Sequence, residues 1–430
     1  MKAAPYPAYK ASGATWLGNV PSHWTVKSIK WESPVLRGAS PRPIDDPLYF
    51  DEDGEYAWVR ISDVTEAGAY LEGTEQVLSD IGSKLSVRLQ PGSLFLSIAG
   101  SVGKPCITRI KCCIHDGFVY FPRWKSDQKF LYYVFASGEP YKGLGKMGTQ
   151  LNLNTDTVGG VVIGLPGIKE QQTIVRFLDA QTAQIDALVA KKLALVDRLK
   201  EKRRALIART VTSGLPPQVA DAFGLGPHSP MKASGVEWFG DVPGHWTVKQ
   251  LKWAVMFQRG HDLPSEQREE GTVPLVTSAG VSATHSVAAA KGPGIVTGRY
   301  GTIGQFHLVF EDYWPLNTTL YTVDLYGNDP HFLLFLLEHL SPLVILHSVK
   351  SAVPGVDRND LHPTIIALPP REEQRAIAAY LDGEISRLDQ LAECVRKVMT
   401  RLTEYRQALI TSAVTGKIDV RERSVELEAA

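Results

Sequence analysis

Two segments of this 430-residue chain occur twice, and this internal repeat is the feature that most limits its possible folds. Residues 11–31 and 233–253, which we call the tryptophan segments, are identical at 14 of 21 aligned positions. Residues 165–212 and 368–415 are identical at 18 of 48 positions. The offset is 222 residues for the first pair and 203 for the second, so both pairs belong to one duplicated plan.

The two stretches between the repeated segments, residues 32–164 and 254–367, are mostly unlike, and we call them the bodies. A constant frame around two different bodies indicates one task performed twice on different targets. The alternative is a duplication followed by drift, without a new specificity. Drift would also have eroded the tryptophan segments, so we favour the first interpretation.

The repeated segments 165–212 and 368–415 have the heptad spacing of a coiled coil, with steps of four and three residues between seam positions. The apolar seam positions are Ile174, Leu178, Ile185, Leu188, Leu195, Leu199, Leu206, Ile377, Leu381, Leu388, Leu391, Val395, Val398, Leu402 and Leu409. The polar seam positions are Gln181, Lys192, Lys202 and Glu384. These polar residues either set the register of the helices, or lie at the edge of the seam or against another protein.

The bodies are rich in short β-type runs interrupted by glycine, followed by short helices near 129–137 and 331–347. The β-type runs are 56–64, 93–107, 118–122, 273–281, 294–310 and 319–325. This mixture predicts an α+β class. The predicted divisions are a first domain at 1–164, a helix at 165–212, an exposed linker at 213–232, a second domain at 233–367, a helix at 368–415 and a tail at 416–430.

The composition excludes several classes of protein. Lys+Arg and Asp+Glu are both 46, so the chain is neither a polybasic binder nor an acidic tail protein. Four cysteines form no disulfide framework, no signal peptide is recognisable, and we expect no membrane-spanning run. The cytoplasm is the expected location.

A search for catalytic motifs finds none that fits. The Gly100–Pro105 segment has the wrong spacing for a nucleotide-binding loop, and the glycines of 221–226 do not follow a strand. Asp116 with Asp127 and Lys129 has the residue types of a metal-dependent nuclease, but the second body has no counterpart. We interpret Cys106, Cys112, Cys113 and His115 as inert buried groups rather than zinc ligands, and His23 and His245 as packing residues.

The repeated motifs resemble the specificity (S) subunit of type I restriction–modification enzymes. They are S-G-x-x-W-x-G-x-x-P-x-H-W, then L-P-x-x-x-E-Q opening a long helix, and a closing R-x-A-L-I with V-T, and together they extend over nearly the whole chain. The resemblance implies two homologous target recognition domains of mixed α/β structure, separated by two long helices that form an intramolecular antiparallel coiled coil. It implies a non-catalytic chain that recognises a bipartite double-stranded DNA sequence.

The same resemblance implies partners that carry the chemistry. Two methyltransferase (M) subunits bring S-adenosylmethionine, restriction (R) subunits bring ATP hydrolysis with magnesium, and this chain holds no cofactor and no metal. The competing interpretations are a non-catalytic coiled-coil adaptor whose two domains bind proteins, and a nuclease or methyltransferase with an unrecognised site. The failed motif search disfavours the latter.

We expect DNA contacts from polar and basic residues in the glycine-flanked loops, since arginine suits guanine, and asparagine or glutamine suits adenine. The candidates are Arg60, Ser62, Ser101, Lys104, Lys146, Thr149, Gln150, Ser278, Arg299, Tyr300, Thr302, Asn317, Lys350 and Arg358. The bodies are slightly acidic, with 13 basic and 16 acidic residues in 32–164, and 6 and 11 in 254–367. We therefore expect weak DNA binding by this chain without its M subunits.

Overall fold

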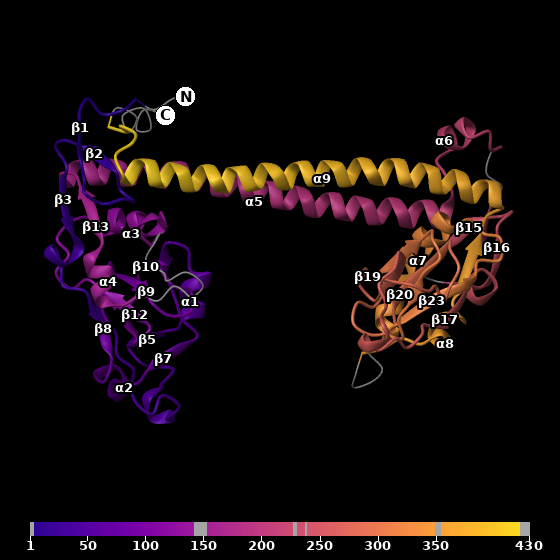
Figure 1. Cartoon of the computed structure of the whole chain (residues 1–430), viewed down its shortest axis with the longest axis horizontal. Coiled ribbons are helices and arrows are strands. Elements are labelled where there is room, and N and C mark those ends of the chain that lie inside the picture. The colour runs from indigo at the N-terminus through magenta and orange to yellow at the C-terminus, as the bar shows by residue number, and fades with distance from the viewer. Residues whose placement is uncertain (1–3, 142–152, 227–229, 237–238, 349–353, 422–430) are drawn as a thin grey trace. The chain divides into compact units, whose positions relative to one another are not determined.

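The structure is a computed structural model, and the residues that it describes are 4–141, 153–226, 230–236, 239–348 and 354–421 (Figure 1). The chain divides into two compact units. Unit 1 comprises residues 1–191 with 397–430, and unit 2 comprises residues 192–396. Both dividing points fall inside long helices, so each long helix contributes one part of its length to each unit.

The two long helices are α5 (Ile168–Ser213) and α9 (Arg371–Val414), close to the predicted spans. Each is preceded by a Leu-Pro pair and followed by a glycine, Gly214 or Gly416, at a positive φ of 80° or 70°. A left-handed residue at this point turns the chain away from the helix axis, which glycine does without strain. The predicted glycine stops are therefore confirmed.

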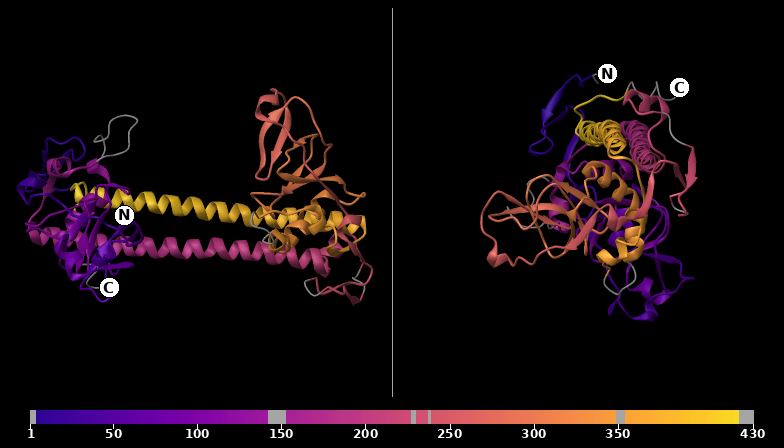
Figure 2. Two further views of the ribbon diagram at one scale, coloured as in Figure 1. Left: turned by 90° about the horizontal axis from the view of Figure 1, so that it is seen from below. Right: turned by 90° about the vertical axis from the view of Figure 1, so that its right-hand side faces the viewer.

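Within each unit, the parts of α5 and α9 lie side by side and run in opposite directions (Figure 2). In unit 1, the beginning of α5 and the end of α9 share one core, with Leu178 and Ile410 fully buried. Arg406 donates to both carboxylate oxygens of Asp186, at 2.9 and 3.2 Å. In unit 2, Ile207 and Ile377 share the second core in the same way. The antiparallel arrangement implied by the family resemblance is present.

The buried stripe of each helix departs from the predicted seam by one residue along part of its length. Leu188 and Leu391, which occupy corresponding seam positions, have 40% and 48% of their surface exposed. Val398 is 38% exposed. Val196 and Ala392, each one residue beyond a seam position, are instead buried.

In both helices, the buried stripe leaves the predicted seam at the same position of the repeat. The buried stripe takes two consecutive steps of four residues, to Thr182 in α5 and to Ile385 in α9, where a strict heptad takes four and then three. A straight α-helix drifts by about 20° per heptad relative to a 3.5-residue repeat, and an extra step of four corrects that drift. Of the other seam residues, the buried ones are Ile174, Leu178, Ile185, Leu199, Ile377, Leu381, Val395 and Leu409, and the half-buried ones are Leu195, Leu206, Leu388 and Leu402.

The first body contains two mixed sheets, of order β4-β12-β9-β10-β6 and β7-β5-β11-β8. Their strands are β4 (Leu36–Arg37), β5 (Tyr56–Val59), β6 (Tyr70–Leu71), β7 (Gln76–Leu78), β8 (Val87–Leu89), β9 (Leu94–Ser97), β10 (Pro105–Thr108), β11 (Cys112–Ile114) and β12 (Phe118–Tyr120). The helices are α1 (Ile61–Glu66), α2 (Asp80–Lys84), α3 (Gln128–Ala136) and α4 (Thr155–Gly160). The 56–64 run is thus only half strand, because Asp63 caps α1 by accepting from the Arg60 amide at 2.7 Å.

The second body contains a four-stranded sheet of order β17-β23-β20-β21 and a three-stranded sheet of order β19-β18-β22. Their strands are β17 (Met256–Arg259), β18 (Val273–Thr277), β19 (Gly280–His285), β20 (Gly294–Gly298), β21 (Phe306–Val309), β22 (Trp314–Pro315) and β23 (Thr319–Asp324). The helices are α7 (Pro330–Ser348) and α8 (Arg358–Leu361). The predicted helices near 129–137 and 331–347 are therefore confirmed as α3 and α7, and so is the α+β class.

Each tryptophan segment takes part in the same small strand pairs in its own unit. In unit 1, β1 (Tyr9–Ala11) pairs with β2 (Asn19–Pro21), and β3 (Thr25–Ser28) pairs with β13 (Val162–Leu165). The corresponding strands of unit 2 are β14 (Met231–Ala233), β15 (Asp241–Pro243), β16 (Thr247–Gln250) and β24 (Ile365–Leu368), with the same antiparallel pairings. The strand that pairs with the segment leads directly into the long helix in both units.

A glutamate at the start of each long helix binds the tryptophan segment. Glu170 accepts from the Trp24 indole at 3.1 Å and lies 2.9 Å from His23 Nε2. Glu373 accepts from the Trp246 indole at 3.1 Å and lies 2.7 Å from its histidine, His245. Both indoles are buried, to 0% and 1% exposure, so these hydrogen bonds satisfy N–H groups that water does not reach. The prediction that the two histidines are packing residues is therefore correct only in part, because their side chains are 45% and 33% exposed and each binds the glutamate.

The glutamine that follows each glutamate connects the body to the same point. Gln171 donates to the Pro166 carbonyl at 2.8 Å and accepts from the Asp127 amide at 2.9 Å. Asp127 is the N-cap of α3. Gln374 makes the matching pair of bonds, each 2.9 Å long, to Pro369 and to the amide of Asp329, which caps the first turn of α7. We call each Glu-Gln pair, with the groups it binds, the anchor of its unit.

The linker predicted at 213–232 is not wholly exposed. It contains a short helix, α6 (Pro217–Ala222), and Leu215 and Ala220 are buried in the core of unit 2. Proline at the first helical position favours this turn, because its fixed φ suits a helix start. The prediction from proline and glycine content was therefore wrong for this part of the segment.

The apolar helix α7 also departs from expectation, since it is long and apolar enough to span a membrane by composition. Many of its apolar side chains instead lie in the core of unit 2, and Phe332, Leu333, Leu336 and Leu337 are at most 1% exposed. Such a helix is typical of a buried core element.

The anchor of unit 2 predicts that removing its glutamate destabilises the protein more than removing the neighbouring glutamate. Replacing Glu373 by alanine leaves the buried Trp246 N–H without its acceptor, and we expect the free energy of unfolding to fall by about 1 to 3 kcal/mol. Urea unfolding followed by tryptophan fluorescence measures the change. The neighbouring Glu372→Ala is the control, because Glu372 is exposed, and an equal loss in both variants would contradict the role of the anchor.

Candidate nucleic-acid interface

The two bodies share one tight turn despite their different sequences. Gly100-Ser101-Val102-Gly103 joins β9 to β10, and Gly301-Thr302-Ile303-Gly304 follows β20 and leads to β21. All four glycines have positive φ, between 63° and 84°. The third residue of each turn donates its amide to the carbonyl of the first, at 2.9 and 3.0 Å. The correspondence predicted between these segments therefore extends to backbone conformation.

In the first body, four of the predicted DNA-contact residues lie around this turn. The Ser101 hydroxyl lies 3.1 Å from that of Thr65 in α1, and Lys104 donates to the Thr65 carbonyl at 2.6 Å. Arg60 is the N-cap of α1, and the exposed Ser62 lies in its first turn. α1 thus lies against the β9–β10 turn at both of its ends, since a Cβ placed on Gly100 would lie 3.0 Å from Ile61, and we call these residues the first cluster.

The arginine of this cluster is neutralised by two carboxylates. Arg60 Nη2 lies 3.3 Å from Asp63 and is also bonded to Glu75, and these hydrogen bonds raise the pKa of the guanidinium. Its side chain lies on a groove of about 850 Å³ that Glu66 and Glu72 also line. The groove is lined by the carboxylates of Asp63, Glu66, Glu72 and Glu75 and by the single guanidinium of Arg60, so its lining is acidic.

In the second body, four predicted residues gather around the matching turn. A Cβ placed on Gly301 would lie 3.1 Å from Ser278 Oγ, so Ser278 lies directly against the turn. Arg299 and Tyr300 immediately precede the turn, and the Arg299 guanidinium lies 4.8 Å from the Tyr300 ring centroid. Thr302 lies within the turn. Arg299 of this cluster forms no ion pair within the described part of the chain, whereas Arg60 of the first cluster is paired with two carboxylates.

The remaining predicted residues are less closely connected. Asn317 donates to Asp262 and is adjacent to Thr318, whose carbonyl accepts from the Arg299 amide at 2.8 Å. Arg358 is exposed at the start of α8, and the nearby Val356 amide donates to the Arg299 carbonyl at 2.9 Å. Lys146, Thr149, Gln150 and Lys350 lie outside the described residues.

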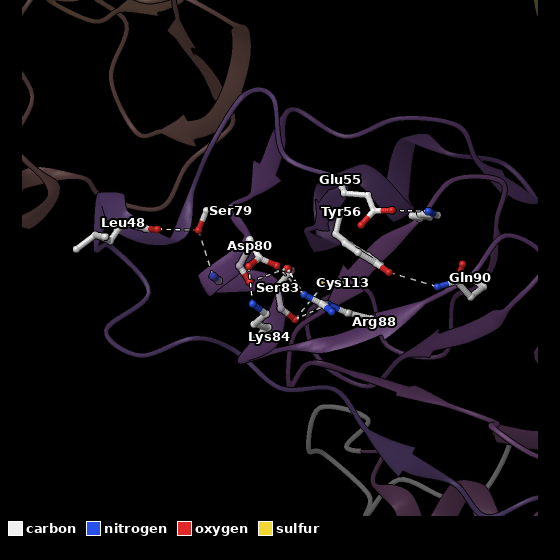
Figure 3. A network of polar contacts seen from close by, with 12 residues as sticks. Leu48, Glu55, Tyr56, Ser79, Asp80, Ser83, Lys84, Arg88, Gln90 and Cys113 are labelled. Carbon is white, nitrogen blue, oxygen red and sulfur yellow. Dashed lines mark hydrogen bonds and ion pairs between the residues drawn. The ribbon is translucent and has the colours of Figure 1, made fainter.

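Other basic groups of the first body are paired with side chains on or beside its four-stranded sheet (Figure 3). Arg88 donates to the Ser83 hydroxyl at 2.7 Å and carbonyl at 3.1 Å, and its guanidinium lies 4.8 Å from the Tyr56 ring centroid. Lys84 forms a 2.5 Å ion pair with Asp80. Internal pairing of this kind leaves fewer cations for DNA phosphates, in agreement with the acidic balance of the body.

The residue types of a nuclease do not come together. Asp127 caps α3, Lys129 forms a 3.0 Å ion pair with Asp179 of α5, and Asp116 accepts from Ser40 at 3.2 Å. Each acidic group is therefore committed to a structural contact. Among the described residues, no group of three or more His, Cys, Asp or Glu side chains has the arrangement of a metal site.

The thiols of the first body are buried, as predicted. Burial raises the pKa of Cys106 and of Cys112 to about 12, and that of Cys113 to about 11. Burial also lowers the pKa of His115. A thiol that is deprotonated only far above neutral pH is a poor nucleophile and a poor metal ligand.

The chain matches the type I restriction modification DNA specificity domain over residues 24–198 and again over residues 243–393. The chain therefore belongs to the type I restriction–modification specificity-subunit family. A curated relative, the putative type I restriction enzyme MjaX specificity subunit of Methanocaldococcus jannaschii, is 22% identical over 447 residues, covering 95% of this chain and 96% of that protein.

Solved structures share the fold of this specificity subunit. One, described as the structural basis of complex assembly and conformational transition of the type I R-M system, has a TM-score of 0.71 at 16% identity and covers 93% of this chain and 99% of its own. The HsdS subunit from Thermoanaerobacter tengcongensis has a TM-score of 0.51 at 16% identity, covering 93% and 98%. The predicted class, with two recognition domains and paired long helices, is thereby confirmed.

Sequence reasoning missed the partners of the predicted contact residues in this specificity subunit. Thr65 connects Ser101 to Lys104, and Glu75 pairs with Arg60 from 15 positions along the chain. The only available signal was the acidic composition of the first body, which indicated pairing without identifying the pairs. Long-range contacts of this kind have no local sequence pattern.

The buried thiols predict a simple chemical result. In the native protein at pH 8, iodoacetamide should alkylate the exposed Cys394 and leave Cys106, Cys112 and Cys113 unmodified, because their thiolates are scarce and enclosed. Intact-mass analysis should show one adduct. In urea all four cysteines should react, and rapid native modification of any buried thiol would contradict the assignment.

Proposed function

We propose that this specificity subunit recognises a bipartite double-stranded DNA target, one half-site with each body. In the same proposal it docks two methyltransferase subunits and the restriction subunits of a type I complex in the cytoplasm. The chain itself is non-catalytic. S-adenosylmethionine, ATP and magnesium belong to the partner subunits, which supply methyl transfer and DNA cleavage.

The observation that carries the proposal is the pair of glycine turns that present different polar groups. The backbone of the turn is the same in both bodies, and the residues around it differ: Arg60 with Ser101 in one, and Ser278 with Arg299 in the other. Hydrogen-bonding groups at base edges determine which sequence is recognised. Two glycine turns with the same backbone and different neighbouring side chains are suited to two half-sites of different sequence.

The membership of the family supports the class of target, and the long helices support a constant separation between the half-sites. α5 has 46 residues, about 69 Å at 1.5 Å per residue, with a glycine stop only at its end. The length of the paired helices would then determine how many base pairs lie between the half-sites. A protein-binding adaptor is the competing function, and methylation mapping distinguishes the two.

The proposal predicts that Arg299 contributes to base discrimination in one half-site. Arg299→Ala removes a guanidinium that can bind guanine through two hydrogen bonds, and we expect discrimination at one base pair of one half-site to fall about 10- to 100-fold, or by about 1–3 kcal/mol. Co-expression with the methyltransferase subunit and methylome sequencing measure it. Arg268→Ala, an exposed arginine of the same body outside the cluster, is the control.

The other half-site is an internal reference in the same experiment, because the first body is unaltered. Deleting the second body, residues 254–367, should abolish the bipartite methylated motif. Methylation that is independent of both changes would favour the adaptor.

The length of the paired helices predicts the length of the spacer, which is the number of base pairs between the two half-sites. Deleting residues 189–195 and 397–403 removes one heptad from each helix and keeps the Asp186–Arg406 ion pair in register. We expect a spacer shorter by about three base pairs, since seven residues span about 10 Å and successive base pairs are about 3.4 Å apart. The methylated motif measures the spacer, and an unchanged spacer would refute the helix-length proposal.

A further inference from the structure

One tryptophan of each tryptophan segment is exposed, at the same position of the repeat. Trp31 has 76% of its surface exposed and Trp253 has 57%. The tryptophans seven positions earlier, Trp24 and Trp246, are buried and bonded to the anchors. Packing therefore explains why both copies keep Trp24 and Trp246, and it does not explain why both keep Trp31 and Trp253.

The fold holds both exposed rings outward in the same way. Each ends a short 3-10 turn, Ile29–Trp31 or Leu251–Trp253, that follows β3 or β16. The first residue of each turn, Ile29 or Leu251, is buried, to 0% and 1% exposure. Two buried neighbours at equivalent positions fix the turns, so the outward direction of the indole is built into the repeated frame.

A lysine accompanies each indole. Lys30 Nζ lies 5.8 Å from the Trp31 ring centroid, and Lys252 Nζ lies 5.2 Å from that of Trp253. The first tryptophan segment contains no acidic residue. Each unit thus presents a cation beside a large apolar ring, which we call the Lys-Trp knob: Lys30 with Trp31, and Lys252 with Trp253.

We propose that each Lys-Trp knob is the docking point of one methyltransferase subunit, inserted into an acidic, apolar-walled pocket of that subunit. This inference rests on the proposed function and assigns the surface that the shared partner uses. The two bodies differ and face different DNA half-sites, whereas the knobs are the same, so their ligand is the component that is the same at both units. Tryptophan is also among the residues most enriched at protein interfaces and in their hot spots.

The test uses the full chain, its Trp31→Ala, Trp253→Ala and double variants, and the purified methyltransferase subunit from the same source. Native mass spectrometry and titration calorimetry count the bound subunits and measure their affinity. We expect two subunits on the wild-type chain, at least tenfold weaker binding at one site in each single variant, and at both sites in the double variant. The unfolding midpoint should stay unchanged, because the rings are exposed.

Two matched controls are Leu48→Ala and Leu346→Ala, which remove side chains that are 65% and 69% exposed on the bodies. Neither should alter the binding of the methyltransferase subunit. Wild-type affinity at both sites in the double variant would overturn the inference, and so would a loss confined to DNA binding by the isolated chain. A wild-type chain that binds no methyltransferase subunit would overturn the proposed function and this inference with it.

Discussion

The carboxylate at the start of each long helix is the contact on which the rest of each unit depends. Glu170 and Glu373 each join a buried indole and a histidine to the helix, and the following glutamine joins the cap of the body's own helix. Three elements from distant parts of the sequence therefore meet at two consecutive residues. Because a buried indole N–H without an acceptor is costly, the two copies keep this contact while their bodies diverge.

Much of the fold was predictable from the sequence because it is encoded in local patterns. The heptads predicted α5 and α9, the glycines after them predicted their ends, and the duplication predicted two equivalent units. The exposed state of Leu188 and Leu391 was not predictable from a strict heptad, because a straight helix drifts and the buried stripe moves with it. The helix in the linker was also missed, since prolines that usually mark loops here begin a turn.

The candidate interface was predictable only in part. The glycines predicted equivalent turns beside Ser101, Lys104, Arg299 and Thr302, because positive φ at glycine is a local requirement, and DNA contact by these residues stays a prediction. The pairing of Arg60 with Glu75 was not predictable, since it joins α1 to a residue beyond the next strand. Local sequence determines the backbone position of a side chain, and tertiary contacts determine whether its charge is already paired within the protein or is free to bind DNA.

The anchors have a combinatorial consequence. Each body meets its unit at an indole, a histidine, a glutamate and a glutamine that are the same in both units, so this contact does not depend on the sequence of the body's loops. A pool of n compatible bodies then yields n² ordered pairs from one unchanged frame. If each body recognises one half-site, as proposed, replacing one body would change one half of the recognition sequence and leave the other half as it was.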